Sequence, residues 1–184
     1  MPTRALAIIA ALALAGCGSM FASKAPATAA APDLPASITP PEHEKMLLRV
    51  NATGVQVYEC ATGRTGIPEW AFKAPEANLL DAQGKVVGTH GAGPFWQLTD
   101  GSRVMGQVVG TADAADPGTI PLLLLKARAP GGTGKLEYVK SIQRLDTKGG
   151  KAPKDACTLG TPLRVPYTAT YVFWGGDPPA LSNK

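Results

Sequence analysis

Histidine and cysteine are scarce in this sequence of 184 residues, which holds two histidines and three cysteines. Zinc requires three or four close His, Cys or carboxylate ligands. His43 lies at the edge of the folded region, which leaves only His90 inside it, so we expect no metal site. A G-x-S-x-G motif is absent, and in the glycine-rich stretch 91–96 Trp96 stands where a nucleotide-binding loop needs its third glycine. We therefore expect no nucleotide cofactor and no hydrolase of that type.

Long hydrophobic runs are also lacking. The apolar run Ala5–Ala15 has 11 residues, whereas a membrane-spanning helix needs about 20. Preceded by Arg4, this run has the form of a secretory signal. The residues that follow it, Leu14-Ala15-Gly16-Cys17, resemble the lipobox of bacterial lipoproteins.

That resemblance implies that residues 1–16 are a signal peptide and that Cys17 is acylated after cleavage. The acyl chains would make the lipid bilayer its partner, because several chains hold a protein stably on a membrane. Gly18 and Ser19 follow Cys17 with no aspartate. In lipoprotein sorting this pattern implies the outer membrane, with the protein facing the periplasm.

The rest of the sequence divides into three parts. Residues 17–41 are rich in alanine and proline without apolar periodicity, which predicts a lipid-anchored tether. Residues 42–174 have the length of a single domain, and residues 175–184 are expected to be a flexible tail. The formal net charge of +4 becomes +3 without Arg4. Because the basic residues of the C-terminal half are spread out, we expect no nucleic-acid partner; the oligomeric state stays open.

Short β-type runs separated by glycine and proline, of which there are 21 and 17, predict an all-β domain. We expect a single antiparallel β-sandwich or barrel-like domain with long loops. Its clearest element is a hairpin turning at Asp100-Gly101. A second turn is expected at Asn51–Gly54, and a short helical turn near Pro40–Leu47. The expected strands are Met46–Asn51, Val55–Cys60, Trp70–Phe72, Ala77–Leu80, Lys85–His90, Phe95–Leu98, Arg103–Val109, Pro121–Lys126, Leu136–Leu145 and Tyr167–Trp174.

Two cysteines remain in the domain once Cys17 is assigned to lipid. In an oxidising compartment Cys60 and Cys157 are expected to form a disulfide, because no C-x-x-C spacing or flanking histidine supports a redox or metal pair. The bridge would tie the second expected strand to the loop before the last strand.

Aromatic residues offer the best functional clue, although most are expected to be core. Trp96, His90 and Arg144 form the candidate ligand site, a shallow pocket for a carbohydrate or small amphipathic ligand. The first hypothesis is therefore a non-enzymatic ligand- or partner-binding β domain held at the membrane surface. The alternative is an uncharacterised enzyme in which His90 works with Asp100 or Glu76.

The whole domain, from about Val50 to Phe173, resembles the family called Domain of Unknown Function 3455. No activity is established for that family, so the resemblance implies none here. The pieces that carry it, in order, include Val55–Cys60, Trp70, Phe72, Glu76–Leu79, Gly88, His90, Gly93–Trp96, Asp100–Ser102, Ile120–Leu124, Ile142–Arg144, Cys157 and Val165–Tyr167.

Overall fold

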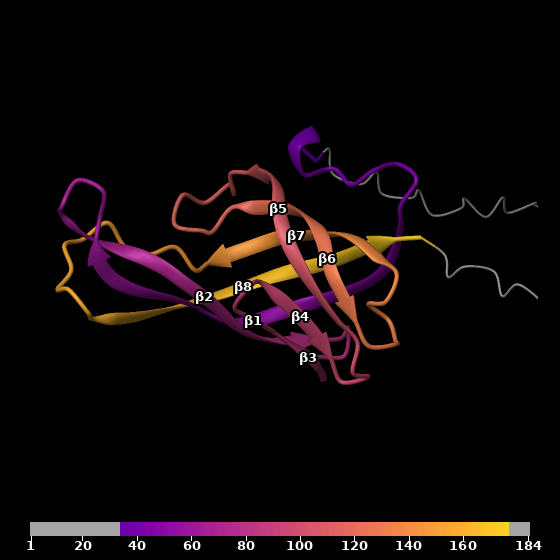
Figure 1. Ribbon diagram of the computed structural model, residues 1–184. Coiled ribbons are helices and arrows are strands. Elements are labelled where there is room, and N and C mark those ends of the chain that lie inside the picture. Colours follow the sequence, from indigo (N-terminus) through magenta and orange to yellow (C-terminus); the bar gives the residue numbers. More distant parts are fainter. Residues whose placement is uncertain (1–33, 177–184) are drawn as a thin grey trace, which may run out of the picture. The chain divides into compact units, whose positions relative to one another are not determined.

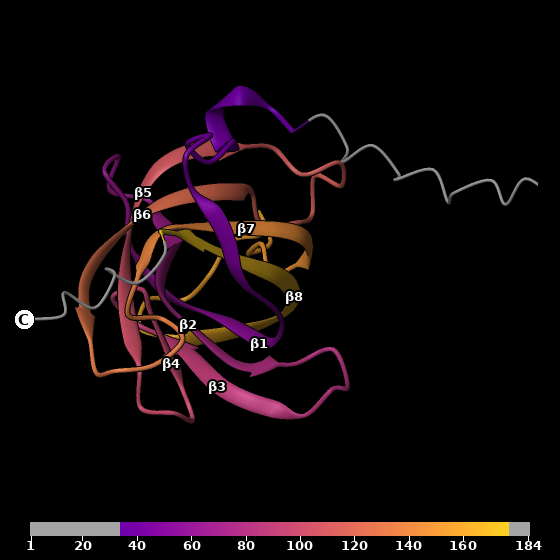
Figure 2. The same cartoon turned by 90° about the vertical axis from the view of Figure 1, so that its right-hand side faces the viewer.

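Eight antiparallel strands form a closed barrel in the computed structural model, which describes residues 34–176. Each strand pairs with the next along the chain, and the last pairs with the first, as Figures 1 and 2 show. The all-β prediction is confirmed, and of its two forms the barrel is correct. The strands are β1 (Lys45–Thr62), β2 (Pro68–Leu80), β3 (Val86–Gly91), β4 (Phe95–Leu98), β5 (Arg103–Ala112), β6 (Leu122–Gly131), β7 (Val139–Gly149) and β8 (Pro162–Gly175).

Several expectations concern residues outside the described range. They are the signal peptide, the acylation of Cys17, most of the tether and the tail beyond residue 176. Within residues 34–176, no helix has the length and apolar character needed to cross a membrane.

The turn expected at Asn51–Gly54 is wrong, because β1 continues straight through these residues. Gly54 instead allows β1 and β2 to approach each other closely. A Cβ atom on Gly54 would lie 2.1 Å from the carbonyl oxygen of Glu76 in β2. Asparagine and glycine together therefore marked tight strand packing here, not a hairpin.

The short turn expected near Pro40–Leu47 occurs at Pro41–Glu44, where Glu44 N donates to the carbonyl of Pro41 at 2.9 Å, but it is not a helix. A short 3-10 helix, η1 (Ala36–Ile38), lies earlier, and strand begins at Lys45. Ile38 is fully buried, and its carbonyl accepts a hydrogen bond from Gln143 Nε2 at 2.6 Å. Ser37 Oγ donates to the carbonyl of Thr111 at 2.8 Å. Residues 36–38 are thus packed on the outer wall of the barrel.

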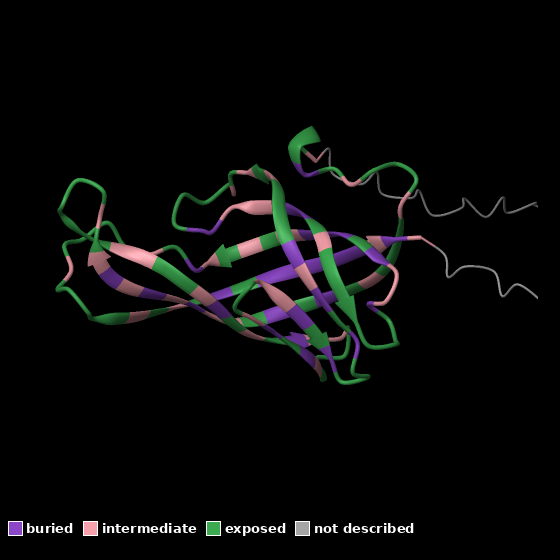
Figure 3. Ribbon diagram, viewed as in Figure 1, coloured by how far each residue is buried: buried purple, intermediate pink, exposed green. Residues whose placement is uncertain are grey.

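Inside the barrel, the inward positions of the strands carry the apolar side chains, since successive residues of a strand face opposite sides. In β8 the inward residues are Tyr167, Ala169, Tyr171 and Phe173, and all are buried (Figure 3). Leu136, from the loop between β6 and β7, is fully buried and joins the same core cluster. Leu136 and Phe173 lie at the end of the barrel where β7 begins and β8 ends, and they fill that end.

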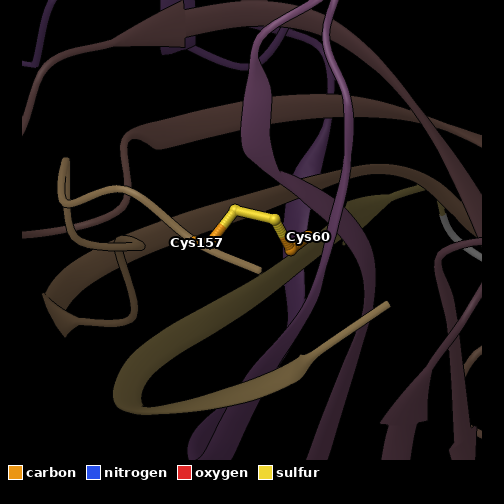
Figure 4. Close-up of a disulfide and its surroundings, with 2 residues drawn as sticks. All are labelled: Cys60 and Cys157. Carbon is orange, nitrogen blue, oxygen red and sulfur yellow. A yellow bond between two sulfur atoms is a disulfide. The ribbon is translucent and has the colours of Figure 1, made fainter. Parts of the chain in front are cut away.

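The predicted disulfide between Cys60 and Cys157 is confirmed (Figure 4). It ties the end of β1 to the loop between β7 and β8, with Cα atoms 5.8 Å apart. Two backbone hydrogen bonds support the same junction, from Cys60 N to Thr161 O and from Gly160 N to Cys60 O, both 2.9 Å. Because the two expected N-terminal strands are one, the bridge starts from the first strand, not the second.

Candidate functional site

A cavity of about 520 Å³ occupies the part of the barrel that the core leaves unfilled. Its walls are mainly apolar and include Ile120, Leu123 and Leu125. Phe72 and Val108 also line it while being 54% and 51% exposed, so they mark the rim where the cavity meets solvent.

Three aromatic rings form the floor of this cavity. The register of β3 and β4 places His90 opposite Trp96, and the two rings stack with centroids 4.5 Å apart. Tyr171 meets both rings edge-on, at 4.9 Å and 5.2 Å. Gly106 makes room for the indole, because a Cβ atom there would lie 2.9 Å from the Trp96 ring.

His90 is held as a neutral, oriented ring. It is 4% exposed, and its Nδ1 lies 2.7 Å from the carbonyl oxygen of Phe95. A carbonyl can only accept, so Nδ1 carries the proton and Nε2 keeps its lone pair. Burial, the largest effect, lowers the pKa of His90, the Phe95 hydrogen bond opposes it, and the positive charge of Arg144 lowers it as well, so that the pKa is about 4.

Arg144 brings a positive charge into the cavity lining. Its Nε and Nη2 donate to the carbonyl of Pro121 at 3.1 Å and 2.8 Å. No carboxylate is among the residues that line this cavity. The ion pairs between described residues involve other partners, and all their side chains are exposed: Arg49–Asp146, Lys73–Glu59 and Arg164–Glu76.

Several buried polar atoms around the floor make no hydrogen bond of full geometry, although the side chains of Gln56, Tyr167, Tyr171 and Arg144 approach one another in that order. They are Gln56 Nε2, Trp96 Nε1 and the hydroxyls of Tyr167 and Tyr171. Three of these residues, Gln56, Trp96 and Tyr171, line the cavity itself. Most buried polar atoms in proteins are satisfied by protein or water, so this cluster marks the polar part of a cavity whose other walls are apolar.

The model of one family matches residues 40–175, most of the chain. Its description reads "Protein of unknown function (DUF3455)". The chain belongs to this family. No curated protein and no solved structure matches it. Function in this DUF3455 member must therefore be argued from the site itself.

The three residues of the candidate ligand site are brought together by the fold. His90, Trp96 and Arg144 come from β3, β4 and β7, and all line the same cavity. The site differs from the expected shallow pocket, because its floor lies inside a barrel. Whether these residues bind a ligand stays a prediction.

The carboxylates of the enzymatic alternative lie elsewhere. Asp100 accepts hydrogen bonds from Ser102 and from the backbone of Lys135, beside the turn between β4 and β5. Glu76 is exposed and pairs with Arg164 at 2.5 Å. Neither carboxylate lines the cavity, so His90 lacks the acidic partner that this hypothesis required.

Gln56 and Tyr171 were missed as site residues. Both lie at inward positions of strands, Gln56 in β1 and Tyr171 in β8. A polar glutamine in phase with the buried residues of Val55–Cys60 was a usable signal. Within residues 34–176, no group of three or more His, Cys, Asp or Glu side chains is arranged to hold a metal ion.

Proposed function

We propose that this protein is a lipid-anchored binding protein of the bacterial envelope whose barrel holds a small amphipathic molecule. The observation that carries the proposal is the cavity of about 520 Å³, with apolar walls and unpartnered buried polar atoms at its floor. Ligand pockets in general span about 300–1,000 Å³ and combine apolar walls with a few polar groups. Eight strands make a barrel just wide enough to be filled by side chains or to hold one small ligand.

The aromatic floor favours an amphipathic ligand over a carbohydrate. A sugar would need an open aromatic face on which to stack. One face of Trp96 is covered by His90, and the edges of Tyr171 and Phe173 pack against the indole, which is 1% exposed. The apolar walls, in contrast, suit a hydrocarbon chain, since burial of each methylene contributes about 0.8 kcal/mol.

Thermal unfolding of the full-length chain carrying Cys17→Ser tests the binding proposal. A ligand that binds only the folded state raises stability by about 2.7 kcal/mol at 100 times its Kd. We expect single-chain amphiphiles to raise Tm and oligosaccharides to leave it unchanged.

Two matched variants locate the binding. Leu123→Trp adds an indole inside the cavity and should abolish the shift, whereas Val109→Trp adds it at an exposed position outside the cavity lining and should retain it. No shift with any amphiphile, or a shift that survives Leu123→Trp, would show that the cavity is not a binding site.

The anchor is proposed from the lipobox-like residues that end at Cys17 and from the absence of aspartate after it. Its test is metabolic labelling with a radioactive or clickable fatty acid, followed by fractionation of the inner and outer membranes. The parent chain should be labelled and sediment with the outer membrane. Labelling that survives Cys17→Ser would refute acylation at this residue.

A further inference from the structure

Arg144 holds an unneutralised positive charge against the cavity. A charge partly removed from water is costly unless it is paired. Arg144 is half-buried, and its guanidinium donates to the carbonyl of Pro121. That carbonyl engages Nε and one N–H of Nη2, and the Tyr171 hydroxyl is a further neighbour. Arginine has five N–H donors, so at least two remain for another acceptor.

The surroundings of Arg144 supply donors and no negative charge. The Tyr171 hydroxyl lies beside the guanidinium; burial raises the pKa of Tyr171 more than the positive charge lowers it, so this hydroxyl stays protonated. Trp96 Nε1 is a further buried N–H without a partner, and Gln56 approaches the Tyr167 hydroxyl. Neutral His90 adds no second cation at physiological pH. Lys73 also lines the cavity, but its side chain is exposed and pairs with Glu59 at 3.6 Å. Arg144 is therefore the cation of the cavity lining that has no carboxylate partner among the described residues.

From this arrangement we propose that the ligand is a single-chain amphiphile with a carboxylate head group, and that Arg144 binds the carboxylate. The inference rests on the proposed binding function and names the ligand class of that same site. A planar guanidinium matches a carboxylate through two parallel N–H···O bonds. The single charge of a carboxylate balances one arginine, whereas a doubly charged phosphate would leave negative charge buried without a partner.

The polarity of the cavity also orients the ligand. Unpartnered polar atoms belong to the buried floor, from Trp96 and Tyr171, while the exposed rim presents the apolar side chains of Phe72 and Val108. The head group therefore enters first, beside Arg144 and its register partner Leu123, and the hydrocarbon tail extends toward the rim. This orientation places the charge of the ligand at the half-buried guanidinium, where electrostatic attraction is stronger than in open solvent.

Binding measurements with chemically matched probes test this inference. The full-length Cys17→Ser chain is stripped of bound lipid and titrated calorimetrically with laurate, methyl laurate, dodecyl phosphate and dodecyltrimethylammonium, each below its micellar concentration. We expect laurate to bind about 10-fold more tightly than methyl laurate, or about 1.4 kcal/mol, and more tightly than either other probe. Laurate labelled with a fluorophore at the end of its tail should still bind, because the tail faces the rim.

Substitution of Arg144 identifies the residue responsible. Arg144→Gln should remove the preference for laurate while leaving the affinity for methyl laurate unchanged, which also shows that the cavity remains folded. Arg144→Lys retains the charge and should keep part of the preference. Arg128→Gln is the matched control, because Arg128 is exposed on the barrel and bonds Gln107.

The outcomes separate this inference from the broader proposal. If no probe binds, the proposed binding function fails. If laurate and methyl laurate bind equally, or if Arg144→Gln keeps the preference, the cavity binds amphiphiles but Arg144 is not the carboxylate site. Tighter binding of dodecyl phosphate or of the cationic probe would overturn the assignment of a carboxylate head group.

Discussion

Acidification should destabilise the fold through His90, well above the pH at which most carboxylates titrate. In the folded protein this imidazole is stacked on Trp96 and bonded to the Phe95 carbonyl, and its pKa is about 4. In the unfolded chain its pKa returns to about 6.5. Between these two values the unfolded state binds a proton that the folded state does not, so stability falls as the pH falls.

The size of the loss follows from the difference in pKa. Each unit corresponds to 1.36 kcal/mol, so His90 alone should reduce the free energy of unfolding by about 3 kcal/mol between neutral pH and pH about 4. The loss begins as the pH drops through the unfolded value of about 6.5. It levels off below about 4, where both states are protonated. For a domain of this size, with a total stability of about 5–15 kcal/mol, that is a large fraction.

Urea unfolding at a series of pH values, followed by tryptophan fluorescence, measures the effect on ligand-free protein. His90→Gln removes the titrating group and keeps a polar side chain. The variant is expected to be less stable near neutral pH but to lose about 3 kcal/mol less than the parent on acidification. Parallel pH profiles for parent and variant would refute the reasoning, because they would mean that His90 has the same pKa in both states.

Two further predictions concern stability. Replacement of Cys60 and Cys157 by serine should lower the free energy of unfolding by up to about 4–5 kcal/mol, since the bridge closes a loop of 97 residues. Denaturation with and without reductant checks this prediction. The stability that the parent protein loses on reduction should equal the stability that the double variant has lost. Gly110→Ala places a Cβ atom 1.7 Å from the carbonyl oxygen of Ser37 and should cost about 1–3 kcal/mol by pushing the N-terminal segment off the barrel. Gly131→Ala, where a Cβ atom meets nothing within 4 Å, is the control, and equal effects at the two glycines would contradict the packing described.

Local sequence signals predicted the strands best where both strand partners lie close along the chain. The Asp100-Gly101 turn located β4 and the start of β5 to the residue, because the turn residues and the flanking alternation are all local. Gly54 led to the wrong prediction of a turn. A glycine is needed there because the backbone of Glu76, which is remote in sequence, leaves no room for a Cβ atom. A glycine required by a distant strand and a glycine required by a turn look alike until the partner is known.

The candidate site was predictable for a different reason. His90, Trp96 and Arg144 were singled out as rare or charged residues among apolar runs, and barrel closure then placed them in one cavity. Closure itself could not be read from the sequence, since it depends on the pairing of β8 with β1. For the same reason Tyr171 and Gln56 looked like ordinary strand residues, although they line the cavity.

The unequal filling of the barrel connects the fold to the proposed function. At one end, Leu136 and Phe173 are fully buried and contribute the packing that offsets the conformational entropy of folding. At the other end, the same strands leave a cavity lined by Arg144, where an additional leucine would have increased stability. A cavity costs free energy, and so does a half-buried charge without a carboxylate partner. The packing of the filled end and the disulfide offset these costs, which leaves the open end free to bind the proposed ligand.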